Sequence, residues 1–145
     1  MSSRASASAK ASADKETLQQ IDCALAELSV IEASLTAARR GQQPGVDRGD
    51  LARRFHAIAH AGAEHHAFAS VQELAALAEK FTDGADRSIL HTAGEIEVVQ
   101  HAADVLSLLL RDMGYQLLGR RGADVTPSVI ALRERLEHQL MAARR

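Results

Sequence analysis

Residues 18–35 read LQQIDCALAELSVIEASL, with apolar side chains at steps of three and four residues. This spacing places the apolar side chains on one stripe of an α-helix. The positions that form the stripe are Leu18, Ile21, Leu25, Leu28, Ile31 and Leu35. Arg39 and Arg40 precede Gly41, which is a typical helix stop. The sequence therefore predicts a helix over residues 14–40.

The chain on either side of this stretch continues the helical pattern. Further helices are expected at residues 48–68, 70–82, 86–113 and 126–143. Ser70-Val-Gln-Glu73 has the pattern of a capping box. Thr126 before Pro127 is typical of a helix start. Five amphipathic helices with mostly short loops predict an all-α fold without strands, an antiparallel bundle of four to five helices. Its core is expected to include Leu25, Phe55, Leu74, Val99 and Leu106.

Length and composition agree with one helical domain. The chain has 145 residues, with 28 alanines, two prolines and only 3% aromatic residues. We expect a disordered tail over residues 1–13, which are small and polar, and a single domain over 14–145. The tail lacks the apolar region of a secretory signal, so a cytoplasmic protein is expected.

Charge and cysteine content exclude several classes of protein. The net charge is −2 and acidic and basic residues are interspersed, which disfavours a nucleic-acid partner. Cys23 is the single cysteine, so an intrachain disulfide and a multi-cysteine zinc site are excluded. The longest apolar stretch, around residues 105–110, is too short to span a bilayer, so no membrane partner is expected.

Four of the seven histidines lie within eleven residues, and they are His56, His60, His65 and His66. His56 is one step from the apolar stripe residue Phe55, so it lies beside the core and faces solvent. A neutral imidazole in this place is a nucleophile at physiological pH. His56, His60 and Glu64 follow one helix face at steps of four residues.

Leu51, Arg53, His56 and Ile58 match, in order, the second-helix pattern of a known family. The turn and third helix of the family are matched by Phe68, Val71, Leu74, Ala75 and Glu79, and residues 95–110 are similar to its fourth helix. The chain thus resembles histidine phosphotransfer (HPt) domains, which include the amino-terminal domain of chemotaxis kinases. The resemblance covers roughly residues 14–142.

The resemblance implies a phosphorelay role in two-component signalling. His56 would be the phosphoacceptor, taking a phosphoryl group from a histidine kinase or a response-regulator receiver and passing it on. The protein would be a relay intermediate rather than a self-contained enzyme, with no cofactor of its own. It has no phosphate-binding loop for ATP, so either another chain or a portion of the protein outside this sequence would supply the ATP-using step. The sequence does not assign an oligomeric state.

The motif differs from the family pattern on the C-terminal side of His56. The family has a Lys that steadies the phosphoryl group where this chain has Ala59, and a Gly that admits the receiver where it has His60. Arg53, Ala59 and His60 are therefore the expected binding residues. Arg53 or Arg54 could supply the positive charge that steadies the phosphoryl group. His60 is expected to narrow the path by which a receiver domain approaches His56.

Other alignments leave alternatives open. Aligning His56 requires one inserted residue before Phe68, and without it Ala57 would occupy the phosphoacceptor position. His60 as the phosphorylated residue fits less well. A degenerate motif also allows a non-phosphorylated adaptor that binds a receiver or kinase.

A metal-binding bundle is the third possibility. The pairs that could contribute ligands are His56 with His60, extended by Glu64, His91 with Glu95, and His101 with Asp104. The chain has no Glu-x-x-His motif of the di-iron bundles. No metal ligand is assigned from the sequence.

Overall fold

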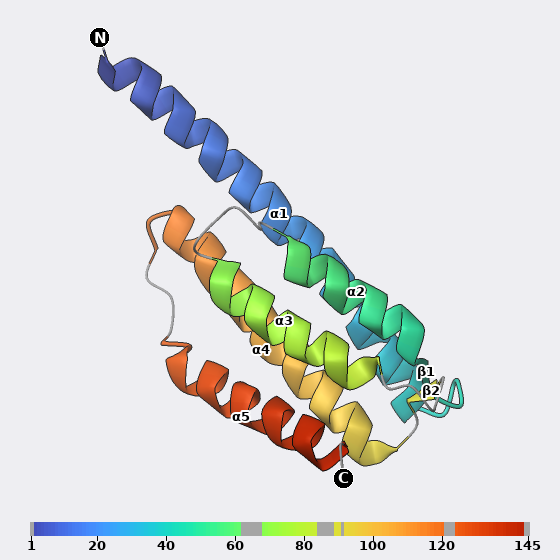
Figure 1. Ribbon diagram of the computed structural model, residues 1–145. Coiled ribbons are helices and arrows are strands. Elements are labelled where there is room, and N and C mark those ends of the chain that lie inside the picture. The colour runs from blue at the N-terminus through green and yellow to red at the C-terminus, as the bar shows by residue number, and fades with distance from the viewer. Residues whose placement is uncertain (1, 62–67, 84–88, 91, 121–123, 144–145) are drawn as a thin grey trace.

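The computed structural model describes residues 2–61, 68–83, 89–90, 92–120 and 124–143, with side chains described from Ala13 onward. Within these ranges the chain is an all-α bundle (Figure 1). The helices are α1 (Ser2–Arg39), α2 (Arg48–His60), α3 (Ala69–Thr82), α4 (Ala93–Leu117) and α5 (Thr126–Ala143). The predicted fold class is confirmed.

Successive helices run in opposite directions (Figure 1). Helix α1 packs against α2 and α4, and α3 packs against α2, α4 and α5. Helices α1 to α4 therefore form a closed four-helix arrangement, and α5 packs on the side made by α3 and α4. The N-terminal end of α1 extends beyond the other helices.

Glycines in the left-handed region end the two longest helices. Gly41 has φ +71° and Gly119 has φ +73°, a conformation that other L-residues rarely adopt. After α4, the N–H of Gly119 donates to the carbonyl of Gln116 (3.0 Å) and the N–H of Arg120 donates to that of Tyr115 (2.8 Å). The same pair of bonds follows α1, so both ends are Schellman motifs. The predicted stop at Gly41 is confirmed.

The start of α1 and the end of α2 differ from the prediction. Helix α1 begins at Ser2, so it includes residues expected to be a disordered tail. These residues are rich in alanine and contain no Gly or Pro to interrupt a helix. Helix α2 ends at His60 rather than at residue 68, because Ala61 is extended (φ −65°, ψ 134°). The expected helical residues 62–67 lie outside the described residues.

The first residues of α3 and α4 also differ from those predicted. Helix α3 begins at Ala69, and its N-cap residue Phe68 makes no capping side-chain hydrogen bond, so the predicted capping box at Ser70 is wrong. Helix α4 begins at Ala93 instead of residue 86. The hydroxyl of Thr92 accepts the N–H of Glu95 (3.2 Å) and donates to its carboxylate (2.7 Å), which fixes this start.

Two short strands, β1 (Val46–Asp47) and β2 (Ile89–Leu90), pair antiparallel, with Val46 opposite Leu90. The expectation of no strand was wrong in this detail. Both Val46 and Leu90 are buried, so the pairing lets two connecting segments close one end of the core. It joins the α1–α2 connection to the segment that precedes α4.

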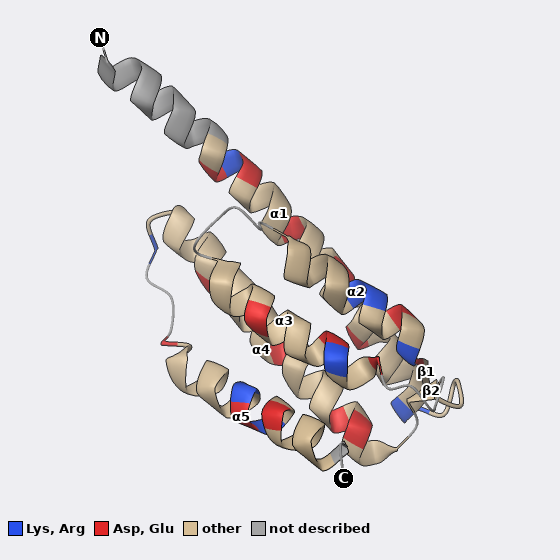
Figure 2. Cartoon of the chain, viewed as in Figure 1, with Lys and Arg blue, Asp and Glu red and all other residues tan. Residues whose placement is uncertain are grey.

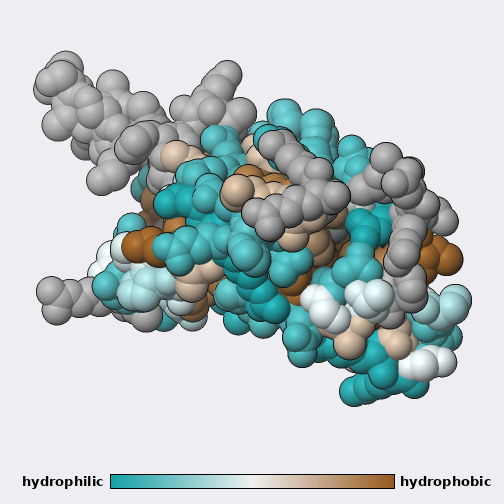
Figure 3. Space-filling view, turned by 60° about the horizontal axis from the view of Figure 1, so that its bottom comes forward, coloured by the Kyte–Doolittle hydropathy of each residue, from teal (hydrophilic) through white to brown (hydrophobic). Residues whose placement is uncertain are grey.

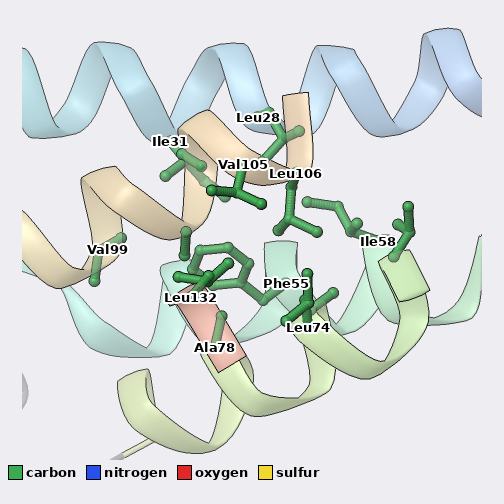
Figure 4. Packing of buried hydrophobic residues seen from close by; sticks show 14 of the residues in the cluster. Leu28, Ile31, Phe55, Ile58, Leu74, Ala78, Val99, Val105, Leu106 and Leu132 are labelled. Carbon is green, nitrogen blue, oxygen red and sulfur yellow. The ribbon is translucent and has the colours of Figure 1, made fainter. Parts of the chain in front are cut away.

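The core lies between all five helices (Figure 4). Phe55 from α2 is fully buried, and so are Leu74 from α3 and Val99 and Leu106 from α4. Leu132 contributes from α5. These positions confirm the predicted core except for Leu25, which is only partly buried against it. Full burial of one such side chain stabilises the fold by about 1.5–3 kcal/mol.

The surface is mixed in charge and largely hydrophilic. Acidic and basic residues are interspersed over the helices in Figure 2. Hydrophilic residues predominate in Figure 3, where hydrophobic residues appear in small separate patches. Among the described residues, no helix combines the length and the apolar character needed to cross a membrane.

One contact between α4 and α5 predicts a dependence of stability on pH. Arg135 donates to Nδ1 of His101 (3.1 Å). Burial, and then the charge of Arg135, lower the pKa of His101 from its ordinary 6.5, while Asp104 opposes the shift. The unfolded chain therefore binds a proton more readily than the folded one, and stability falls as the pH drops below about 6.5 toward the lowered pKa.

We expect His101→Gln to lose less stability than the wild type when the pH falls from neutral to mildly acidic. The difference should be under about 1 kcal/mol, because the ring is partly exposed to solvent. Urea unfolding at both pH values measures it. Equal losses in the two proteins would contradict the assigned role of His101.

Candidate functional site

The candidate site is an imidazole–carboxylate pair between α2 and α3. Nδ1 of His56 lies 2.8 Å from Oε1 of Glu79 and 3.0 Å from Oε2. The His56 side chain is 59% exposed, whereas that of Glu79 is 25% exposed. The predicted exposure of His56 beside the core is therefore confirmed.

The packing of α2 against α3 positions this pair. Phe55 and Ile58 turn one face of α2 into the core, which leaves His56 on the flank. On α3, Ala78 is buried, and Glu79 follows it at the edge of the same interface. The two helices lie side by side (Figure 1), so the ring and the carboxylate meet across their boundary.

The pairing determines which ring nitrogen is available for chemistry. A carboxylate only accepts hydrogen bonds, so Nδ1 carries the hydrogen that is donated to Glu79. In the neutral ring the lone pair is then on Nε2. Among the described residues, Nε2 of His56 has no hydrogen-bond partner. A carboxylate on one nitrogen fixes the tautomer and the orientation of the ring.

His60 lies against the His56 ring. The two ring centroids are 4.1 Å apart and the ring planes are tilted by 33°. Nδ1 of His60 donates to the backbone carbonyl of His56 (2.9 Å), one turn earlier in the helix. This bond holds the His60 ring in place beside His56. His60 therefore occupies the space where the family pattern has a glycine.

The two candidate arginines have different surroundings. Arg54 donates to Asp50 and to Glu27, each at 2.9 Å, so it connects α2 to α1. These carboxylates, Asp50 first, raise the pKa of Arg54. The Arg53 side chain is 78% exposed, and Nη2 reaches Asp50 only at 3.5 Å. Of the two, Arg53 is the arginine that lies beside His56.

Ala59 follows His56 by three residues on α2, so it lies on a neighbouring stripe of the same helix, toward the core. It is partly buried and packs against the hydrophobic core. The structure therefore places the side chains of Arg53 and His60 at His56, whereas the methyl group of the neighbouring Ala59 packs against the core and offers no charge to a phosphoryl group. Ala57, the phosphoacceptor position of the alternative alignment, is exposed. Its methyl group offers no lone pair to a phosphoryl group.

Arg48 is a residue that sequence reasoning missed. Its guanidinium donates to the carbonyls of Phe81 (3.1 Å) and Thr82 (3.3 Å), and it pairs with the carboxylate of Glu95. It thus joins the start of α2 to the end of α3 and the start of α4. The sequence offered little signal for it, because these three contacts are distant along the chain. Glu79 did carry a signal, since it matches the third-helix pattern.

Most of the proposed metal ligands do not converge. Within the described part of the chain, no group of three His, Cys, Asp or Glu side chains could hold a metal ion. Glu95 is bound to Arg48, and Nδ1 of His101 faces Arg135. Glu64, His65, His66 and His91 lie outside the described residues.

Comparisons of the chain with models of protein families, with curated proteins and with solved structures find no match. The function must therefore be inferred from the geometry of the site itself.

Proposed function

We propose that the protein is a histidine-containing phosphotransfer protein, and that Nε2 of His56 is the phosphoacceptor. The observation that carries this proposal is the pair of contacts from Glu79 to Nδ1 of an exposed imidazole. These two contacts leave an oriented lone pair on Nε2 of His56, and an activated nucleophile requires such a lone pair. A surface histidine with no functional role does not require a carboxylate partner on Nδ1. The resemblance of the motif around His56 supports the same assignment.

The transfer step follows from this arrangement. The lone pair of Nε2 attacks phosphorus as the bond from phosphorus to the donor oxygen breaks, and the electron pair of that bond leaves with the donor. The donor is an acyl phosphate of a receiver or the γ-phosphoryl group used by a kinase. The ring gains positive charge as the N–P bond forms, and the Glu79 carboxylate offsets it. Transfer to a receiver aspartate is the reverse step.

The test is phosphorylation by a small donor, phosphoramidate, followed by mass spectrometry and an acid-stability assay. We expect one acid-labile, base-stable phosphoryl group on His56, and none there in His56→Gln. His138→Gln is the matched control, because His138 is an exposed histidine on α5. A wild-type protein without label, or a His56→Gln variant that labels equally, would contradict the proposal.

The His60 ring beside His56 favours one alternative, a non-phosphorylated adaptor that uses the exposed face of α2 to bind a receiver or kinase. A ring 4.1 Å from His56 restricts the space around the nucleophile. The relay predicts faster transfer to receivers in His60→Gly. The adaptor predicts receiver binding by a wild-type protein that never labels.

A further inference from the structure

The space next to the His56 ring is open toward the N-terminus of α2 and occupied toward its C-terminus. On the N-terminal side lies an open depression of about 280 Å³, lined by Gly49, Ala52, Arg53, His56, Glu79 and Asp83. On the C-terminal side the tilted His60 ring lies against the His56 ring and is held by its bond to the His56 carbonyl. A group beside the His56 ring therefore has open space on the Arg53 side and the His60 ring on the other side.

The direction in which Nε2 of His56 attacks phosphorus makes both neighbours of the ring, His60 and the depression, relevant to the transfer. The Nε2 lone pair lies in the plane of the ring, so phosphorus must approach in that plane, in line with the breaking bond. The three non-bridging oxygens of the phosphoryl group carry most of its charge and spread around that line. With the His60 ring on one side of His56 and the depression on the other, the oxygens of an attacked phosphoryl group would have these two different surroundings.

Among the described residues that line this depression, Arg53 is the one Lys or Arg. Its guanidinium is well exposed and has only a long contact to Asp50, so it can turn toward an anion at little cost. Of the two acidic residues described in the lining, Glu79 is engaged by His56, and Asp83 is the other. A guanidinium can contact two phosphoryl oxygens at once.

We propose that the phosphoryl group enters over this depression and that Arg53 holds its oxygens, while His60 closes the opposite side of the ring. This inference rests on the proposed function. It makes Arg53 a residue that contacts the transferred group. It also places the approach of a donor over the start of α2 and the end of α3, on the side away from His60.

Initial labelling rates with phosphoramidate test the proposal, because a small donor needs no docking surface. We expect Arg53→Gln to slow labelling about tenfold, as for the loss of one charge-assisted hydrogen bond. Arg53→Lys should recover part of the rate. Arg111→Gln, which removes an exposed arginine from α4, should label at the wild-type rate. His60→Ala should label at least as fast as the wild type.

The outcomes separate this inference from the proposed function. If His56 labels in the wild type and Arg53→Gln labels equally fast, the assignment of Arg53 is wrong and the proposed function stands. If His60→Ala slows labelling while Arg53→Gln does not, the oxygens lie on the His60 side and the inference is overturned. A wild-type protein that takes no label overturns both.

Discussion

Replacing Glu79 by Gln should lower the initial rate of phosphoryl uptake by His56 about 10- to 100-fold, the range found when a carboxylate partner of a functional histidine is removed. Glutamine keeps the size of the side chain but removes the negative charge. It also places an amide NH₂ where a carboxylate oxygen now faces Nδ1 of His56. The imidazole loses the charge that offsets its developing cation, and only one side-chain oxygen remains to accept from Nδ1 and hold the tautomer.

Glu73→Gln is the matched control, since Glu73 lies on the same helix but pairs with Arg133 of α5. It should label at close to the wild-type rate. Thermal melting of both variants checks that the bundle is intact. If Glu79→Gln labels as fast as the wild type, the His56–Glu79 contact is only a surface ion pair, of the kind worth little in solution.

The sequence predicted where His56 and Glu79 lie on their helices, but not that they touch. Periodicity places His56 beside the buried Phe55, and the same reasoning applied to α3 places Glu79 next to Ala78. Their contact depends on the rotation and axial offset of α2 relative to α3. Those are set by the interlocking of many core side chains, which no local pattern encodes.

Helix ends could be predicted from the sequence where neighbouring residues determine them, and could not where residues distant along the chain do. The stop at Gly41 was predictable, because a left-handed glycine acts within one turn. The start of α3 was not, because the position of the chain there is fixed by Phe68, which is fully buried in the core. The start of α4 is local, at Thr92 and Glu95, but a continuous apolar pattern through Ile89 obscured it. The strand pair joins residues far apart in sequence.

Replacing Arg48 by Met should lower the free energy of unfolding by about 3 kcal/mol, because it removes one partner of a largely buried ion pair. The side chains of Arg48 and Glu95 are 11% and 23% exposed. Without the guanidinium, the Glu95 carboxylate keeps only its contact with Thr92 and the N-terminus of α4. The carbonyls of Phe81 and Thr82 lose a cation at the C-terminus of α3, where cations are favourable.

Urea unfolding measures this loss, with Arg53→Met as the matched control, since it makes the same substitution on the exposed side of the same helix. The control should change stability by less than about 0.5 kcal/mol. Adding Glu95→Gln to Arg48→Met should recover part of the loss, because the uncompensated carboxylate is then gone. If Arg48→Met were as stable as the control, the contacts of Arg48 with Phe81, Thr82 and Glu95 would make no net contribution to the free energy of unfolding.

The same variant also probes how the fold supports the site. Arg48 holds α3 by the carbonyls of Phe81 and Thr82, within one turn of Glu79. Loosening this end should increase the motion of the Glu79 carboxylate relative to His56. We therefore expect Arg48→Met, measured well below its melting temperature, to label more slowly than the wild type but faster than Glu79→Gln. A full wild-type rate would mean that core packing alone positions Glu79.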